Sequence, residues 1–353
     1  MVSTDLGSSS FYLNRELSQL EFARRVLAMA RSQDIPMLER LRYLCITSSI
    51  LDEFFEIRVA GLKQQAAYGS VQRDADNLSA DEQLVKIAES AKRLVADLYC
   101  VLNDELAPEM SAEGVRLLRP HEWTEPQVVW LKRFFSREVA PIISPMGLDP
   151  APPSPEPVHK SPAFIVTLEG RDAFGRNSGR AIVQAPRSLP RVIRLPDDVS
   201  EGRCDMVLLA TIVRYFVSDL FLGMKATGCH QFRVTRNSDL FVDEEAVDDL
   251  LIALEGELSS RRFGDAVRLE VSLDCPEELS RFLIGQFGLT DNDLYVCQGP
   301  VNLGRLDAIP DLVEAPELKY PSFRPRIPEQ LRRSETIFEA IADNEILLHH
   351  PYE

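Results

Sequence analysis

The stretch from Asn14 to Gly61 constrains the fold most, because helix signals follow one another along it with few interruptions. Ser18-Gln19-Leu20-Glu21 has the form of a capping box, in which Ser18 and Glu21 each bond the other's backbone N–H. We therefore predict that a helix starts at Ser18. Apolar residues recur behind this start at helical spacing and give a broad stripe for burial; they are Leu20, Ala23, Leu27 and Ala30, flanked by Phe22, Val26 and Met29.

Further helices are expected along the first third of the chain. Pro36 stands where a proline commonly opens a helix, and the sequence at 49–52 has the form of a cap that begins a third helix. A second capping box at 79–82 begins a long amphipathic helix, and Gly114 is suited to a helix C-terminus. These signals predict an all-α N-terminal helical domain over residues 1–114.

Residues 115–325 alternate strand-like and helix-like patterns. The strand-like runs lie at 163–168, 180–184, 232–235, 267–273 and 294–296. The helical patterns lie at 124–139 and near 206–222, 244–260 and 276–286. This alternation predicts an α+β head domain with a mostly antiparallel sheet that is covered on one side. The fold class is therefore α+β multidomain, with the helical domain first.

The last residues, 326–353, are expected to begin a third domain. Ser334 is predicted to cap a short helix, and Ile346-Leu347-Leu348 has the pattern of the first strand of a buried sheet. A first strand without its sheet leaves backbone groups unpaired and apolar side chains exposed. We therefore expect this tail to be disordered or to dock on another surface.

Composition and charge narrow the class of partner. The chain has 353 residues, of which 45% are apolar and 27% charged, as in ordinary globular proteins. Its 55 acidic residues outnumber 39 basic ones, and the net charge of −16 repels polyanions over about 10 Å at moderate ionic strength. We expect no nucleic-acid partner.

Compartment signals point to a soluble cytoplasmic protein. The most apolar run, 206–222, is interrupted by Arg214 and Asp219, so no integral membrane segment is expected. The first residues lack the basic and apolar regions of a secretion signal. Six cysteines form no CxxC and no metal-ligand spacing, which indicates reduced thiols in the cytoplasm.

One acidic cluster invites a metal assignment. Asp52, Glu53 and Glu56 could together hold Mg²⁺. However, acidic residues in a first helical turn are expected from the helix dipole alone, and Mg²⁺ usually also needs substrate phosphates. We therefore favour a structural role for the cluster and predict no metal site built by this chain.

The amino-acid sequences of several blocks are more specific to one protein family than their helix signals are. ELSxLxFxxRVL, PxLERLRxLxI and LDEFFEIRVAGLK, in this order, closely resemble the N-terminal domain of the long, two-histidine class of bacterial polyphosphate kinases. FRVTRNSDL at 232–240, AVRLEV at 266–271 and IFEAIADNEILLHHPYE at 337–353 resemble the same family. The resemblance therefore extends over the whole chain.

The resemblance implies an activity and its cofactors. Enzymes of this class transfer the terminal phosphate of ATP, with Mg²⁺, onto polyphosphate through a phosphohistidine. Their helical domain closes over the nucleotide base and their head domain mediates dimerisation, whereas the catalytic histidines lie in later domains. His349 and His350 belong to a block that precedes those histidines, so we expect no catalytic residue in this chain.

By position in the resembling block, the candidate nucleotide-binding residues are Ile50, Asp52, Glu53, Phe54 and Arg58. The family normally has an asparagine where this chain has Ile50, and isoleucine offers neither donor nor acceptor. The lost hydrogen bond would cost about 1 kcal/mol or more. A second family asparagine is replaced by alanine at position 23. These changes weaken the expectation of adenine recognition.

Two functions follow. The resemblance implies that the chain is the N-terminal half of a polyphosphate kinase that acts on ATP and polyphosphate. We expect this half to lack the catalytic C-terminal domains and to be inactive alone. Alternatively, it is a non-catalytic dimerising or interaction module that pairs with a full-length kinase or another protein. In both cases we expect a homo-oligomer formed through the head domain.

Overall fold

The computed structural model describes residues 8–69, 73–148, 160–171, 179–186, 188–202, 204–221, 223–238 and 264–353. It divides into two compact units, Met1–Glu314 and Ala315–Glu353. The first unit holds the helical region and both sheets. The prediction of domains 1–114, 115–325 and 326–353 rests on the sequence and stays a prediction.

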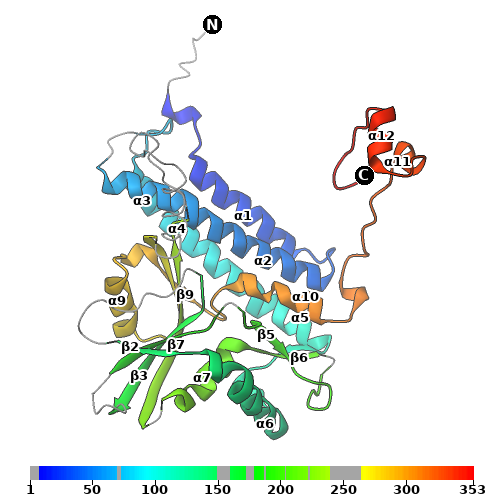
Figure 1. Ribbon diagram of the computed structural model, residues 1–353. Coiled ribbons are helices and arrows are strands. Elements are labelled where there is room, and N and C mark those ends of the chain that lie inside the picture. The colour runs from blue at the N-terminus through cyan, green and yellow to red at the C-terminus, as the bar shows by residue number, and fades with distance from the viewer. Residues whose placement is uncertain are drawn as a thin grey trace. The chain divides into compact units, whose positions relative to one another are not determined.

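The helical region is built from long helices that pack along their lengths. Figure 1 shows α1, α2 and α4 running side by side. The region consists of η1 (Ser9–Phe11), α1 (Arg15–Arg31), α2 (Met37–Glu53), α3 (Ala60–Ala67), α4 (Ala80–Cys100) and α5 (Ala107–Ala112), with π-helical segments η2 (Phe54–Val59) and η3 (Val101–Leu106).

The first helix starts earlier than predicted. Its cap is Asn14, whose Oδ1 accepts a hydrogen bond from the backbone N–H of Leu17 at 2.9 Å. Ser18 lies inside the helix, and its hydroxyl donates to the Asn14 carbonyl at 2.8 Å. The predicted start at Ser18 is therefore wrong, because asparagine caps as well as serine and the residues between them favour helix. The capping box of Ser79 and the helix end at Gly114, where φ is 75°, are confirmed.

The predicted third helix at 49–52 is also wrong. As predicted, α2 follows Pro36, but it continues through Ser49 to Glu53 and passes through η2 directly into α3. No proline or glycine interrupts the sequence there, so the backbone has no reason to leave the helix. The winding changes at Phe54 instead, and π-helical turns of this kind often occur at functional positions.

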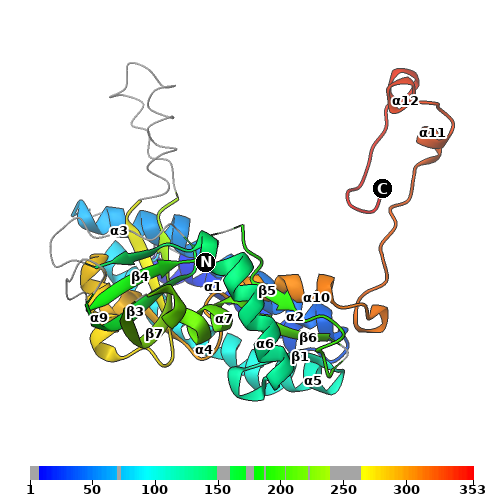
Figure 2. The same ribbon diagram turned by 60° about the horizontal axis from the view of Figure 1, so that its bottom comes forward.

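The larger sheet confirms the predicted antiparallel α+β architecture. Its strands lie in the order β2-β4-β3-β7-β8-β9, and every pair is antiparallel except β8 and β9. Figure 2 shows β4, β3 and β7 side by side. The strands are β2 (Pro145–Gly147), β3 (Ala163–Gly170), β4 (Arg180–Gln184), β7 (Met224–Arg236), β8 (Ala266–Ser272) and β9 (Leu294–Cys297).

A second, three-stranded sheet was not predicted. Its order is β1-β6-β5, with bounds β1 (Val115–Leu117), β5 (Val192–Arg194) and β6 (Cys204–Leu208). Strand β6 occupies the start of the segment predicted as a helix near 206–222. A short, continuously apolar run does not distinguish a buried strand from a buried helix, which explains the error. The predicted helix at 244–260 lies outside the described residues.

The remaining helices of this unit surround the sheets. Those at 124–139 and 276–286 confirm the predicted helical patterns. They and their neighbours are η4 (Pro120–Glu122), α6 (Glu125–Phe134), η5 (Phe135–Val139), η6 (Ala140–Ile142), α7 (Leu209–Phe216), η7 (Val217–Leu220), α9 (Glu277–Gln286), η8 (Asp291–Asp293), η9 (Leu303–Ala308) and α10 (Ile309–Leu312).

Both faces of the larger sheet are covered, which corrects the prediction of one covered side. One face of β3, β4, β7 and β8 packs against α9 through residues such as Ile165, Phe232 and Leu283. The opposite face of β3 and β4 forms a second core with the segments around α6 and α7, to which Phe164 and Val183 contribute. The strands alternate side chains between these faces, so two cores share one sheet.

The second unit, Ala315–Glu353, contains η10 (Pro316–Leu318), α11 (Glu329–Arg332) and α12 (Ile337–Asp343). Thr336 caps α12, and the predicted cap at Ser334 is wrong. The predicted strand at 346–348 is absent from this described segment, and Leu347 is 93% exposed. A strand needs a neighbouring strand for its backbone groups, and none lies beside this one. The chain end turns back instead, since the Arg326 N–H donates to the Tyr352 carbonyl at 2.8 Å.

Candidate functional site

The LDEFF segment, residues 51–55, lies where the helical region meets the larger sheet. It spans the last turn of α2 and the start of η2, which contacts both β7 and β8. On these strands Arg233 is paired in register with Glu270, while their neighbours Val234 and Leu269 face the core beneath α9. Strand alternation therefore turns charged side chains toward the helices.

Four side chains form a buried ion-pair network at this junction: Asp52, Arg233, Arg268 and Glu270. The Asp52 carboxylate accepts from Arg233 Nη1 and Nη2 at 2.7 and 2.8 Å, and from Arg268 Nη2 at 3.1 Å. Arg268 Nη2 lies 2.8 Å from a carboxylate oxygen of Glu270, which also pairs with Arg233. The arginine side chains are only 1% and 2% exposed, so water scarcely screens these contacts.

The network balances two positive charges with two negative ones. Burial raises the pKa of Asp52, but the charges of Arg233 and Arg268 outweigh it and lower that pKa to about 2. Burial likewise lowers the pKa of Arg233, whereas Asp52 and Glu270 outweigh it and raise that pKa above its usual value. Asp52 and Arg233 are therefore both charged at neutral pH, and the pairing compensates for their desolvation.

Aromatic rings complete the enclosure of Arg268. Its guanidinium lies 4.7 Å from the ring centre of Phe55 and 5.5 Å from that of Tyr295. These two rings meet edge to face with centroids 5.4 Å apart. The rings attract the cation and exclude water from it, which strengthens the network. The LDEFF segment thus supplies both a carboxylate and an aromatic ring to the junction.

The predicted nucleotide-binding residues are spread over different environments. Asp52 and Phe54 are buried, Ile50 is half-buried, and Glu53 and Arg58 are exposed. None of the five lines either of the two pockets described below. Their assignment to a nucleotide stays a prediction, and for Asp52 the structure gives a structural partner.

The acidic cluster does not converge on one point. Asp52 pairs with the two arginines, Glu53 is exposed, and Glu56 pairs with Lys160 from the segment before β3. In the described part of the chain, no three His, Cys, Asp or Glu side chains are grouped as a metal site would need. Asp52 and Glu56 act as partners of cations within the fold.

Sequence reasoning missed Arg233, Arg268 and Glu270. All three lie in blocks that carry the family resemblance, FRVTRNSDL and AVRLEV, where charged and apolar residues alternate. Such alternation commonly indicates a strand with one solvated face. Because the pattern is the same for a solvated and a buried polar face, only the tertiary structure identifies these charges as buried.

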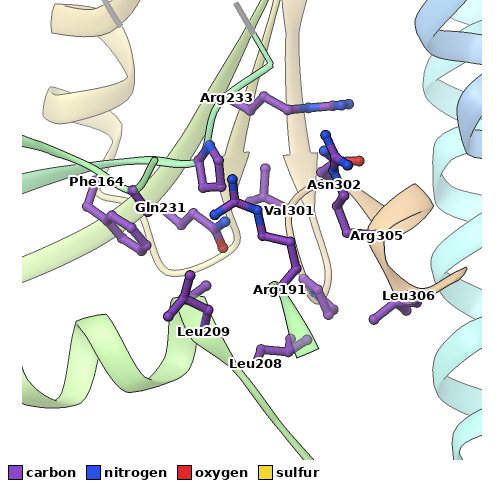
Figure 3. A pocket seen from close by; sticks show the side chains of 14 residues that line it. Phe164, Arg191, Leu208, Leu209, Gln231, Arg233, Val301, Asn302, Arg305 and Leu306 are labelled. Atoms are coloured by element: carbon purple, nitrogen blue, oxygen red, sulfur yellow. The ribbon is translucent and has the colours of Figure 1, made fainter. Parts of the chain in front are cut away.

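A small pocket adjoins the network on the other side of Arg233. Its volume is about 40 Å³, and it lies between the sheets and the segment that leads into η9 (Figure 3). Arg233 forms part of its wall together with Gln231, Asn302, Arg191 and Arg305. The polar groups of this wall face a floor of apolar residues that includes Phe164, Leu208 and Leu209.

A larger groove of about 830 Å³ runs along α7 and past the ends of β7, β8 and β9. Arg214 and Asp274 form an ion pair within its lining, and the Nδ1 atom of His230 lies 3.4 Å from Asp274. Burial lowers the pKa of His230, although Asp274 acts in the opposite direction. His121, unlike His230, lines the groove itself.

The remaining candidate histidines lie in the second unit. His349 and His350 are exposed, and the ring of His349 packs against Tyr352 with centroids 5.1 Å apart.

None of the helices found in the described ranges combines the length and the apolar character that a membrane span requires.

The fold and the site define an α+β protein in which buried ion pairs join two parts of residues 1–314, the helical region and the larger sheet. Family models match both parts: the polyphosphate kinase N-terminal domain matches residues 12–118, and the polyphosphate kinase middle domain matches residues 126–309. The chain therefore belongs to the polyphosphate kinase family.

Curated relatives support this membership. The polyphosphate kinase of Pseudomonas aeruginosa is 50% identical over 99% of this chain and 50% of its own length. The polyphosphate kinase of Pseudomonas syringae is 51% identical over 100% of this chain and 48% of its own length. That of Neisseria meningitidis is 48% identical over 97% of this chain and 50% of its own length. The chain thus spans about half the length of the curated relatives that it matches.

A solved structure shows the same fold. The crystal structure of polyphosphate kinase from Porphyromonas gingivalis superimposes with a TM-score of 0.74 at 24% sequence identity, over 96% of this chain and 47% of that one. The helical domain followed by a mixed sheet domain is therefore the arrangement found in that kinase.

Proposed function

We propose that residues 1–353 are the N-terminal and head part of an ATP:polyphosphate phosphotransferase. In this proposal, the complete enzyme transfers the terminal phosphate of ATP onto polyphosphate through a phosphohistidine. The family membership and the half-length match to polyphosphate kinases support it. We place the histidine that receives the phosphate in a part of the complete enzyme outside these residues, so we expect the 353-residue protein to transfer no phosphate alone.

The ion-pair network is the observation that carries the proposed role. Asp52 lies within the match to the N-terminal domain, whereas Arg233, Arg268 and Glu270 lie within the match to the middle domain. A buried, neutral network across this boundary holds the helical domain in one orientation on the sheet. Catalysis by positioning requires such rigid support, because small displacements of a substrate-binding element reduce rates strongly.

The proposed nucleotide surface is the side of α2 and η2 that is not used for the network. Glu53 and Arg58 are exposed there and Ile50 is half-buried next to them in sequence. When bound, Mg²⁺ would neutralise charge on the ATP phosphates and would be held mainly by those phosphates. Isoleucine at position 50 provides no polar group to the adenine, so we propose weak nucleotide binding by these residues alone.

The activity proposal has a direct test. The purified 353-residue protein is incubated with radiolabelled ATP and Mg²⁺, with the full-length Pseudomonas aeruginosa relative as a positive control. We expect neither polyphosphate nor acid-labile phosphoprotein from the 353-residue protein, while the control produces polyphosphate. Detection of either product with the 353-residue protein alone would contradict the proposal that these residues transfer no phosphate without the rest of the enzyme.

The second candidate function is a dimerising module, and exposed apolar side chains of the head domain favour it. Val129, Ile142, Leu273 and Val296 are between 46% and 65% exposed. Burial of these side chains against a second copy of the chain would remove apolar surface from water and so stabilise a dimer. Sedimentation equilibrium should give a monodisperse homodimer, and a monomer at all concentrations would exclude this module.

The reducing cytoplasm is the proposed compartment. All six cysteines lie in described residues and are free thiols; Cys45, Cys204, Cys229 and Cys297 are buried, whereas Cys100 is exposed. An exposed free thiol is more compatible with a reducing compartment than with an oxidising one.

A further inference from the structure

The segment that follows β9 lies against the helical region, and we call residues 298–304 the strap. Two strap carbonyls accept hydrogen bonds from side chains of the helices. The Gln298 carbonyl accepts from Asn103 Nδ2 at 2.9 Å, and the Pro300 carbonyl accepts from the Tyr99 hydroxyl at 2.7 Å. The bond from Tyr99 is partly buried, so removing its hydroxyl would leave the carbonyl without this donor. Helix α4 and η3 thus hold the backbone of the strap.

The strap backbone also approaches two helices closely. A Cβ atom at Gly299 would lie 3.2 Å from the nearest ring atom of Tyr99, and one at Gly304 would lie 3.2 Å from Ser49 Oγ. A larger residue at either position would therefore require the neighbouring side chain to shift. The two glycines allow the strap to lie directly on α4 and α2.

Helix α2 holds the chain at the end of the strap and beyond it. The Cys45 thiol donates to the Leu303 carbonyl at 3.4 Å, and Arg42 Nη2 donates to Asp311 Oδ1 at 2.8 Å. Figure 1 shows α10 beside α2. By sequence this segment belongs with the sheets, since the match to the middle domain extends to residue 309. By these hydrogen bonds, it is joined to the helical region.

The strap is at the same time a wall of the larger groove. Gln298, Gly299 and Pro300 line the groove, and Thr211 and Tyr215 line it from α7. Helix α7 shares a hydrophobic core with strands β3 and β4, so it is fixed to the larger sheet. The space between the strap and α7 therefore depends on how the helical region is oriented on the sheet.

We propose that the strap moves as one body with the helical region, so that the orientation of this region sets the width of the groove. The chain passes between the helical region and the sheets before β1 and after β9. Gly114, with a φ of 75°, stands at the first passage and Gly299 at the second. Hinges are commonly formed by a few residues at the ends of elements, and these residues are often small.

The ion-pair network opposes this motion, because it joins α2 to β7 and β8. The movement is therefore a rare local opening, which hydrogen exchange detects. A molecule that binds in the groove at one width would favour the matching orientation of the helical region. The groove volume of about 830 Å³ is within the range of small-molecule sites. The groove is thus a place from which the helical region can be controlled.

The test measures native-state hydrogen exchange of the 353-residue protein at several low urea concentrations, with mass spectrometry as the readout. Three sets of amides are compared, those of residues 302–312, of α4 and of β3. The first set includes the Arg305 N–H, which donates to the Asn302 carbonyl at 3.2 Å. We expect residues 302–312 to open together with α4, at urea concentrations at which β3 stays protected.

Tyr99→Phe removes one attachment of the strap, and Tyr68→Phe is the matched control, because Tyr68 is 85% exposed. We expect exchange of residues 302–312 to become roughly fivefold faster in Tyr99→Phe, with α4 and β3 unchanged, and no change in the control. Cys229 is a buried thiol that lines the groove. Its alkylation should accelerate by a similar factor in Tyr99→Phe, because the groove widens.

The proposal is overturned if residues 302–312 open with β3, or if all three sets of amides open only together. It is also overturned if Tyr99→Phe leaves the exchange of residues 302–312 or the alkylation of Cys229 as in wild type. If Tyr99→Phe destabilises the whole protein, Asn103→Ala, at a half-buried position, decides the question in its place. Neither readout involves ATP or phosphate transfer, so a failure leaves the proposed function untouched.

Discussion

Asp52 at the end of α2 accepts two parallel hydrogen bonds from Arg233 on β7, at 2.7 and 2.8 Å, although 181 positions separate the two residues. This bidentate geometry is the strongest form of side-chain pairing between a carboxylate and a guanidinium. Both side chains are buried, so removing one partner leaves the other as an uncompensated charge. The attachment of the helical domain to the sheet therefore depends on this pair.

The two arginines of the network should not be equally important. Arg233→Met is expected to lower the free energy of unfolding by about 3–5 kcal/mol, because Asp52 loses its bidentate partner. Arg268→Met removes the same charge but leaves that pair intact, and Arg268 Nε and Nη1 have no hydrogen-bond partner among the described residues. We expect a smaller loss for it. Urea unfolding, which avoids a charged denaturant, compares the two, and an equal or larger loss for Arg268→Met would be inconsistent with this network.

Acid should weaken the junction through Asp52. The pKa of Asp52 is lowered from 3.8 to about 2, since Arg233 and Arg268 outweigh the effect of burial. A folded-state pKa below the unfolded value gives stability that is present above pH 5 and is lost as the pH falls toward 2. Between pH 5 and pH 3 we expect wild type to lose roughly 1 kcal/mol more than Asp52→Asn. Urea midpoints at these pH values measure the difference, and parallel pH dependences of the two proteins would refute it.

The start of α1 gives a prediction that separates the observed cap from the one suggested by the sequence. Asn14→Ala should cost about 1 kcal/mol, because the Leu17 N–H loses its side-chain acceptor. Ser18→Ala, inside the helix and exposed, should change stability by less than about 0.5 kcal/mol. Urea unfolding of both variants measures this. A larger loss of stability for Ser18→Ala than for Asn14→Ala would instead indicate that Ser18 caps the helix, as the sequence suggested.

The substitution at position 50 predicts a recoverable nucleotide site. Ile50→Asn should tighten ATP binding by roughly fivefold or more, since one hydrogen bond contributes about 1 kcal/mol. Val85→Asn is the matched control, because Val85 is an exposed apolar residue of α4 and is not among the candidate nucleotide-binding residues. Calorimetric titration of Mg²⁺-ATP into wild type and both variants tests this. Equal affinity of wild type and Ile50→Asn would remove the proposed role of position 50.

Local signals predicted the fold where one short motif determines the structure. The capping box at Ser79 and the strand-like runs at 163–168 and 180–184 are confirmed, because their hydrogen bonds or alternation are set within a few residues. The predicted helix starts at Ser18 and at 49–52 are wrong, because each sequence resembles a cap but lies inside a helix. Strand β6 was missed because its burial pattern has no period.

The site was less predictable than the fold. The sequence shows Asp52 within a family block and Arg233 and Glu270 within strand-like runs, but not that they meet. Their pairing depends on how a helix packs on a sheet 181 positions away along the chain, and sequence spacing does not encode that distance. Short-range patterns therefore indicate which residues are unusual, while the structure identifies their partners.

A double-mutant cycle of Asp52→Asn and Arg233→Met tests most directly whether this pair fastens the two domains. The free energy of unfolding in urea is measured for wild type, both single variants and the double variant. Each single variant leaves an unbalanced charge, whereas the double variant leaves Arg268 paired with Glu270. We predict that the double variant loses at least about 2 kcal/mol less than the sum of the single losses. Losses that add within about 0.5 kcal/mol would contradict the pairing.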